Sequence, residues 1–228
     1  MQALPGGRLV MENFSLRGLI QFAYGVMDFQ MEGLPAWTDL VHYDVQAKAE
    51  GDFSVKQMEG PMLQALLEDR FQLRVHREIR QMPVYELSVA KSGVKMKATG
   101  PGECVPYDAN AAPPVVHLSG AGGLPVFCGY PTNRVTGSNR TLDGAGVSAA
   151  VLIANLSRLA VDRSIIDKTG LDAGYDVHLE WAADALADDA GGTSIFTALQ
   201  EQLGLKLEAA KGPVEVLVID SVKRASPN

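Results

Sequence analysis

The sequence reads Ser15-Leu16-Arg17-Gly18-Leu19-Ile20 near its start and Ser148-Ala149-Ala150-Val151-Leu152-Ile153 beyond its middle. Serine, leucine and isoleucine occupy the same places in both stretches. Each serine is placed to begin a helix, because its hydroxyl oxygen can accept a hydrogen bond from a free N–H group of the first turn. The pair is the first indication of an internal repeat.

Further matches between the two parts of the chain keep almost the same offset. Tyr43-Asp44-Val45 matches Tyr175-Asp176-Val177, and Pro83-Val84 matches Pro213-Val214. Five apolar positions also correspond: Leu63, Leu67, Phe71, Leu73 and Val75 match Ile195, Leu199, Leu203, Leu205 and Leu207. A nearly constant offset over separated segments predicts an internal duplication.

The duplication predicts the α+β class, in which each half packs two helices on small mixed or antiparallel sheets. The predicted domains are a first repeat over 1–99, a Gly/Pro-rich connector over 100–138 and a second repeat over 139–228. The elements expected in the first half are strands over Leu9–Glu12, Met27–Met31 and His42–Ala49, helices over Ser15–Tyr24 and Ser54–Arg70, and a hairpin formed by Phe71–Ile79 and Pro83–Ala90. Those expected in the second half are helices from Ser148 and over Ser194–Leu203, strands through Ile165-Ile166 and over Tyr175–Trp181, and a hairpin over Leu205–Val222.

Apolar and polar residues alternate in the strand predicted after the second helix, as they do when one face of a strand is buried. The expected inner face carries Leu73, Val75 and Ile79. The expected outer face carries Arg74, His76, Glu78 and Arg80. On this pattern His76 is a solvated histidine.

Size and charge set bounds on the partners. The chain has 228 residues, 46% of them hydrophobic, and a net charge of −7. This acidity argues against a nucleic-acid partner, which needs clustered Lys and Arg. The densest basic stretch, Arg70–Arg80, is diluted by acidic residues. No apolar run reaches the roughly 20 residues of a membrane-spanning helix. The start, Met1–Gly7, does not look like a signal peptide, so we expect either a cytosolic protein or a mature exported one.

The two cysteines, Cys104 and Cys128, both lie in the irregular middle of the sequence. A metal site would need more Cys or His nearby, and only His117 is close. A disulfide is therefore the favoured interpretation, and it would indicate an oxidising compartment. Two free buried thiols are the alternative.

Three polar residues, Asp176, His178 and Glu180, alternate along a predicted strand and therefore share one face. Two carboxylates and an imidazole could hold Zn²⁺, or Ca²⁺ with added oxygen ligands. A bound metal could activate water for hydrolysis. The alternative is a solvated strand face, and the matching positions of the first half, Asp44, Gln46 and Lys48, form no metal site.

Other candidate motifs have plain structural explanations. Gly146-Val147-Ser148-Ala149-Ala150 approaches the nucleophile elbow of hydrolases, but a helix cap explains Ser148 as well as Ser15. Asp167-Lys168-Thr169-Gly170 resembles a phosphorylated aspartate motif, yet a strand end followed by a turn explains it. Three aromatic residues, Tyr24, Phe29 and Trp37, could line a groove for an apolar or sugar ligand, or close the end of a small core.

Several stretches resemble a soil-associated bacterial family of unknown function, over nearly the whole chain. They are Leu19–Gly25, Gly33–Trp37, Tyr43–Ala49, Met62–Phe71, Val161–Leu171 and Ser194–Leu205. The resemblance implies an exported protein, and in some members a domain that follows a sensor-type membrane peptidase. It implies no activity. Members usually have a further strand before the segment corresponding to Gly6-Gly7-Arg8, and this chain is expected to start too late to contain it.

Each half is also similar to the short N-terminal domain of secretins and TonB-dependent receptors, a periplasmic protein-interaction module. This similarity implies a non-catalytic binding domain of the cell envelope, whose partner is a protein or a small molecule and which needs no cofactor. The alternative is a small hydrolase of the ester or lactone type, assisted by Ca²⁺ or Zn²⁺. The face formed by Asp176, His178 and Glu180 discriminates between the two.

Overall fold

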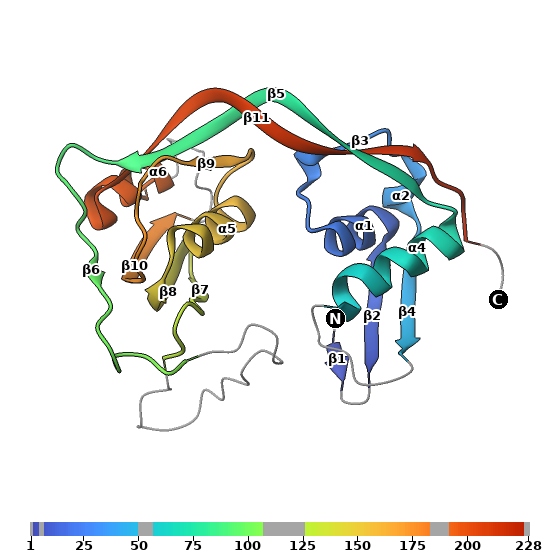
Figure 1. Ribbon diagram of the computed structural model, residues 1–228, viewed down its shortest axis with the longest axis horizontal. Coiled ribbons are helices and arrows are strands. Elements are labelled where there is room, and N and C mark those ends of the chain that lie inside the picture. Colours follow the sequence, from blue (N-terminus) through green and yellow to red (C-terminus); the bar gives the residue numbers. More distant parts are fainter. Residues whose placement is uncertain (1, 5–6, 50–56, 107–125, 183–191, 226–228) are drawn as a thin grey trace. The chain divides into compact units, whose positions relative to one another are not determined.

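A computed structural model of the chain describes residues 2–4, 7–49, 57–106, 126–182 and 192–225. It contains helices and both parallel and antiparallel strands, so the predicted α+β class is confirmed (Figure 1). His117 lies outside the described residues.

The described residues form two compact units. Unit 1 holds the residues up to Arg80 and those from Val214 onward, and unit 2 holds the residues from Gln81 to Pro213. Each unit therefore takes residues from both halves of the sequence. The predicted boundaries at 1–99, 100–138 and 139–228 concern the repeat, and they stay a prediction.

Unit 1 contains an antiparallel sheet in the order β1-β2-β4. The elements of unit 1 up to residue 71 are β1 (Gln2–Leu4), β2 (Arg8–Ser15), α1 (Leu16–Tyr24), the 3-10 turn η1 (Asp28–Gln30), β3 (Met31–Glu32), α2 (Trp37–Leu40), β4 (His42–Lys48), the π-helical turn η2 (Met58–Met62) and α4 (Leu63–Phe71). The core joins Met11 and Val45 of the sheet to Leu19 of α1 and Leu67 of α4. Burial of these apolar faces is what holds the helices on the sheet.

The first helix begins and ends as its sequence predicts. The Ser15 hydroxyl oxygen accepts a hydrogen bond from the Gly18 N–H at 3.1 Å, which confirms the predicted cap. Gly25 ends α1 in the left-handed conformation, with φ 64°. Glycine favours this conformation because it has no side chain to clash with the backbone.

Unit 2 contains a second antiparallel sheet, in the order β6-β10-β8-β7. Its elements are β6 (Lys97–Ala98), β7 (Thr132–Thr136), β8 (Asn139–Val147), α5 (Ala149–Leu159), β9 (Ile165–Asp167), β10 (Tyr175–Ala182), α6 (Ile195–Ala198) and the π-helical turn η3 (Leu199–Leu203). Ser148 caps α5, as predicted, and Ser194 caps α6. Leu142, Leu179 and Trp181 of the sheet are buried in the unit 2 core.

Two long strands replace the predicted hairpins. β5 runs from Arg74 to Val89 and β11 from Leu205 to Ser221, and they are neighbours in a sheet of order β3-β11-β5-β9. The hairpin predictions are therefore wrong. A tight hairpin needs positive φ in its loop, and Gly212 is not among the residues with positive φ. A side chain at Gly212 would instead collide with Ile166, so this glycine marks a close approach rather than a turn.

Three smaller predictions also need correction. Only Met31 of the segment Met27–Met31 belongs to a strand, because the Gln30 side chain accepts a hydrogen bond from the Met27 N–H at 3.0 Å and closes a 3-10 turn. Ile79 is 67% exposed although its alternation predicted burial, because the unit 1 core of the described residues includes Leu73 and Val75 but does not reach Ile79. A strand does precede Gly6-Gly7-Arg8, since β1 pairs with β2.

The disulfide between Cys104 and Cys128 is confirmed, with their Cα atoms 5.1 Å apart. It lies against Gly146, where an added Cβ would approach the Cys104 sulfur at 3.4 Å. The bridge therefore packs against the end of β8, directly before the cap of α5.

The two halves share several local features. A serine caps the first helix of each, a short strand following that helix joins a long strand in parallel, and the last helix of each includes a π-helical turn. These features favour a duplication, which stays a prediction. Superposition of Ser15 on Ser148 and of Tyr43 on Tyr175 would test it.

Candidate functional site

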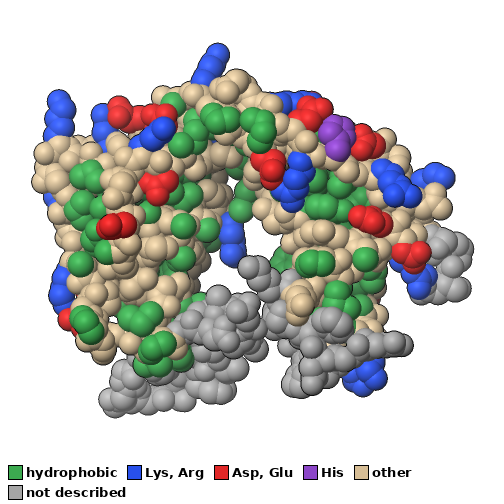
Figure 2. All heavy atoms as spheres, in the orientation of Figure 1, with side chains coloured by type: hydrophobic (Ala, Val, Ile, Leu, Met, Phe, Trp, Pro, Cys, Tyr) green, Lys and Arg blue, Asp and Glu red, His purple; other side chains and the backbone are tan. Residues whose placement is uncertain are grey.

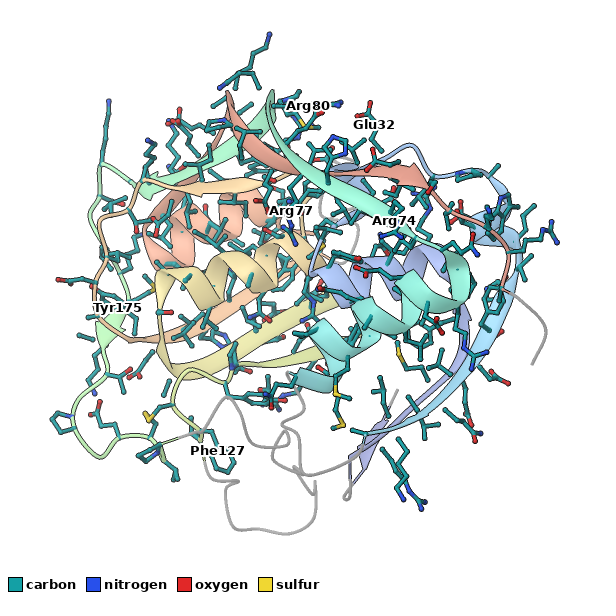
Figure 3. All side chains as sticks on the ribbon, turned by 45° about the vertical axis from the view of Figure 1, so that its right-hand side comes forward. Glu32, Arg74, Arg77, Arg80, Phe127 and Tyr175 are labelled. Carbon is teal, nitrogen blue, oxygen red and sulfur yellow. A yellow bond between two sulfur atoms is a disulfide. The ribbon has the colours of Figure 1, made fainter. Side chains whose placement is uncertain are left out.

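Strand β10 carries the three polar residues that the sequence singled out. Asp176, His178 and Glu180 alternate with Val177 and Leu179, which are buried. Because successive side chains of a strand point to opposite faces, the polar three share the face opposite to the unit 2 core. The first of them follows Tyr175, which Figure 3 labels.

Each of these three side chains has a different partner. Asp176 accepts a hydrogen bond from the Thr99 hydroxyl at 2.6 Å. His178 Nδ1 lies 2.6 Å from Asp143 Oδ1. Among the described residues no group of three or more His, Cys, Asp or Glu side chains is placed to hold a metal ion. The metal site stays a hypothesis.

The third residue, Glu180, is held from two sides. Asn139 Nδ2 donates to Glu180 Oε1 at 2.7 Å. The Gln202 side chain reaches the backbone of Glu180, where its Oε1 accepts from the N–H at 2.8 Å and its Nε2 donates to the C=O at 2.8 Å. Two residues further along β10, Ala182 donates its N–H to the Thr193 carbonyl oxygen at 2.9 Å. At Glu180 and Ala182 the outer edge of β10 is thus paired with side-chain and loop groups, whereas β6 pairs with this edge only at Tyr175 and Asp176.

A cavity of about 390 Å³ opens at this edge of β10. It is lined by Asn139, His178, Glu180, Trp181, Ala182, Thr193 and Gln202. We call this cavity the β10 pocket. The period-two pattern of β10 predicted His178 and Glu180, but it gave no sign of Asn139, Thr193 or Gln202. These come from other segments, and only the three-dimensional fold brings them to β10.

The three predicted aromatic residues belong to unit 1, whereas the residues that line the β10 pocket belong to unit 2. Tyr24 and Trp37 pack against the unit 1 core, and Phe29 is partly buried. The Arg224 guanidinium lies 5.5 Å from the centre of the Trp37 ring. The Tyr24 hydroxyl is buried and has no hydrogen-bond partner among the described residues. Burial, with the charge of Glu68, raises its pKa above the ordinary value.

Both catalytic-looking motifs have structural roles. The Ser148 hydroxyl oxygen accepts a hydrogen bond from the Val151 N–H at 3.3 Å and so caps α5. Asp167 Oδ1 accepts from the Thr169 N–H at 2.8 Å and from the Thr169 hydroxyl at 2.7 Å. Such bonds to a residue two positions on are typical of a turn that follows a strand.

A network of ion pairs lies on the part of β5 and β11 that belongs to unit 1. Figure 2 shows acidic and basic side chains side by side over these strands, and Figure 3 shows Arg80 next to Glu32. Arg80 pairs with Glu32 and with Glu78, and Arg77 pairs with Glu215. The basic stretch seen in the sequence is therefore largely neutralised by its neighbours.

His76 lies between two carboxylates of this network. Its Nε2 is 3.0 Å from Glu78 Oε1 and its Nδ1 is 2.9 Å from Asp220 Oδ1. Both nitrogens can donate only when the ring is protonated. The hydrogen bond to Glu78, followed by the one to Asp220, raises the pKa of His76 above its ordinary value.

We expect His76 to stabilise the fold most at low pH. A folded pKa raised above the unfolded one gives stability that is complete below the unfolded pKa and is lost as pH rises through the folded pKa. NMR titration of the His76 ring should place its pKa above that of an exposed histidine. Glu78→Gln should lower the pKa, and Asp220→Asn should lower it less. A His76 that titrates as a free histidine in all three proteins would contradict the prediction.

The fold and the pocket together define an α+β protein with a polar cavity at a sheet edge. A family model described as "Protein of unknown function (DUF3738)" matches residues 17–222, and the chain belongs to this family. No curated protein and no solved structure matches the chain. The resemblance to a family of unknown function is confirmed. Its soil-associated source, its link to sensor peptidases and the likeness of each half to the secretin and TonB domain stay predictions.

In the described part of the chain, no helix combines the length and the apolar character needed to cross a membrane.

Proposed function

We propose that the chain is a non-catalytic binding domain of an exported, cell-envelope protein, and that the β10 pocket is where it binds. The observation that carries this proposal is the cavity of about 390 Å³ at the edge of β10. Its volume lies within the range of small-molecule sites, roughly 300–1,000 Å³. A small polar ligand is therefore favoured over a partner protein.

The polar groups of the pocket are held in place before any ligand arrives. His178 is fixed by Asp143, and Glu180 is fixed by Asn139. Gln202 is fixed by two hydrogen bonds to the backbone. Side chains that are already ordered lose little conformational entropy on binding, so the arrangement favours recognition.

The disulfide supports the exported part of the proposal. Bridges such as Cys104–Cys128 persist in oxidising compartments and are rare in the cytosol.

The alternative, a metal-assisted hydrolase of the ester or lactone type, has less support. Ser148 is engaged as a helix cap, and Asp176 is engaged by Thr99. A water-activating metal needs ligands that converge on one point, whereas Asp176, His178 and Glu180 are each directed to a separate partner.

We expect small polar fragments to bind the β10 pocket. In a ¹⁵N-labelled protein, fragments from a mixed collection should shift the amide signals of His178, Glu180 and Gln202. Thr193→Trp should abolish these shifts by filling the pocket, because Thr193 lines it. Thr136→Trp, a matched exchange at an exposed residue of β7, should leave them unchanged.

Two results would count against this proposal. Fragment shifts that are equal in both tryptophan variants would show that the β10 pocket is not the binding site. A rise in melting temperature of roughly 5–10 °C with Zn²⁺ or Ca²⁺, as expected for a ligand at a hundredfold over its Kd, would favour the hydrolase if it disappeared in Asp176→Ala/Glu180→Ala.

A further inference from the structure

On the outer edge of β10, the backbone groups on both sides of His178 have hydrogen-bond partners. Alternate residues of a paired strand direct their N–H and C=O groups to the same edge. Glu180 and Ala182 direct theirs outward, as their bonds to Gln202 and Thr193 show. Asp176 pairs outward with Lys97 of β6. His178 lies between these positions, so its N–H and C=O also point outward.

The chain does not continue β6 past His178. If the register of β6 were extended by two residues, Lys95 would face His178. Lys95 instead donates its backbone N–H to the Leu203 carbonyl oxygen at 3.0 Å and its Nζ to the Glu201 carbonyl oxygen at 2.8 Å. Among the described residues, nothing pairs with the backbone N–H and C=O of His178. One donor and one acceptor therefore face the β10 pocket, which His178 lines.

Gln202 shows what kind of group fits this edge. Its primary carboxamide accepts from the N–H of Glu180 and donates to the C=O of the same residue. A primary carboxamide can do this because its oxygen and one of its N–H groups point in the same direction. The C=O and N–H of a trans peptide bond point in opposite directions, so one peptide bond cannot make both contacts.

We propose that the free position at His178 binds a primary carboxamide of a small ligand, in the same way as Gln202 binds Glu180. The inference rests on the proposed binding function of the pocket. An extended peptide strand is disfavoured, because Lys97 and Gln202 occupy the edge on both sides. A carboxylate is disfavoured too. It has no hydrogen for the His178 C=O, and Glu180 and Asp143 lie close by.

The test compares three probes that share a phenyl ring, on the full chain. Benzamide carries the primary carboxamide, benzoate lacks the donor, and N,N-dimethylbenzamide lacks both N–H groups. Benzamide should shift the backbone amide signal of His178 in a ¹⁵N NMR titration. Each missing hydrogen bond should weaken binding about tenfold, so the other two probes should bind at least that much more weakly.

Two substitutions at His178 separate its backbone from its side chain. His178→Pro removes the outward N–H, and proline is tolerated where the N–H of an edge strand faces solvent. His178→Ala keeps both backbone groups. Both variants lack the imidazole, so benzamide should bind His178→Pro about tenfold more weakly than it binds His178→Ala. Should the proline variant not fold, Gln202→Ala gives an independent test, because it exposes the same pair of groups at Glu180. Benzamide should then also shift the Glu180 signal.

The failure of this inference is distinguishable from that of the proposed function. Equal binding of benzamide and N,N-dimethylbenzamide at the pocket would overturn the carboxamide assignment and leave a binding pocket in place. Loss of benzamide binding in His178→Ala would overturn it as well, since the imidazole would then be the recognised group. If no probe and no fragment shifts any lining residue, both proposals fall.

Discussion

Gly204→Ala is expected to lower the free energy of unfolding by about 2–5 kcal/mol, which sums the cost of a left-handed alanine and that of overpacking. Gly204 ends the last helix with φ 69°. A Cβ at this position would overlap the backbone carbonyl oxygen of Gly93 and lie 2.9 Å from the Lys95 nitrogen. Backbone atoms cannot rotate away as a side chain can, so the turn over residues 90–95 must move. That turn is held by the bonds Ala90 N to Gly204 O and Lys95 N to Leu203 O.

Gly170→Ala is the matched control for this experiment. Gly170 lies in the same unit with φ 66°, and a Cβ there would meet nothing within 4 Å. Gly170→Ala should therefore lower the free energy of unfolding only by the cost of a left-handed alanine, about 1–2 kcal/mol. Urea unfolding in a Trp37→Phe background reports on unit 2 through the fluorescence of Trp181, because each unit holds one tryptophan. Equal losses in the two alanine variants would show that the contact with Gly93 is not tight.

The local elements of the fold could be predicted because short-range chemistry determines them. Ser15, Ser148 and Ser194 each cap a helix, and a cap depends only on a hydroxyl and the first turn that follows it. β10 could be predicted because alternation of apolar and polar residues needs only one buried face.

The long strands could not be predicted from local patterns. Pro83 and the pair Gly212-Pro213 are typical of turns, and the sequence therefore indicated two hairpins. Whether such residues bend the chain depends on what packs against them. At Gly212 the side chain of Ile166 takes the space of the missing Cβ, and the strand continues. The contact comes from a residue distant in the sequence, so no local signal could have revealed it.

The candidate site was predictable only in part, for the same reason. The face formed by Asp176, His178 and Glu180 follows from the strand period. The partners that define the chemistry of this face cannot be derived from the strand period. Thr99, Asp143 and Asn139 engage the three side chains from other strands and loops. Gln202 looked like one more polar residue of a helical stretch, yet its carboxamide completes the edge of β10.

Removal of the disulfide is expected to cost about 3.5 kcal/mol in the free energy of unfolding, from the loop-closure entropy of a bridge across this separation. Cys104 and Cys128 are 24 residues apart, and the bridge restricts the unfolded chain between them. The double variant Cys104→Ser/Cys128→Ser should show the loss in urea unfolding followed by Trp181 fluorescence. The original protein treated with a reductant should show the same loss, whereas the double variant should not respond to the reductant.

The same experiment bears on where the protein works. An intact mass two hydrogen atoms lower before reduction than after it would show that the bridge forms in the purified protein. A loss of about 3.5 kcal/mol is a large part of the 5–15 kcal/mol that typically stabilises a domain. A protein that depends on its bridge to this extent is suited to an oxidising compartment and poorly suited to a reducing one. Equal masses, with unfolding unaffected by reductant, would remove the main structural argument for export.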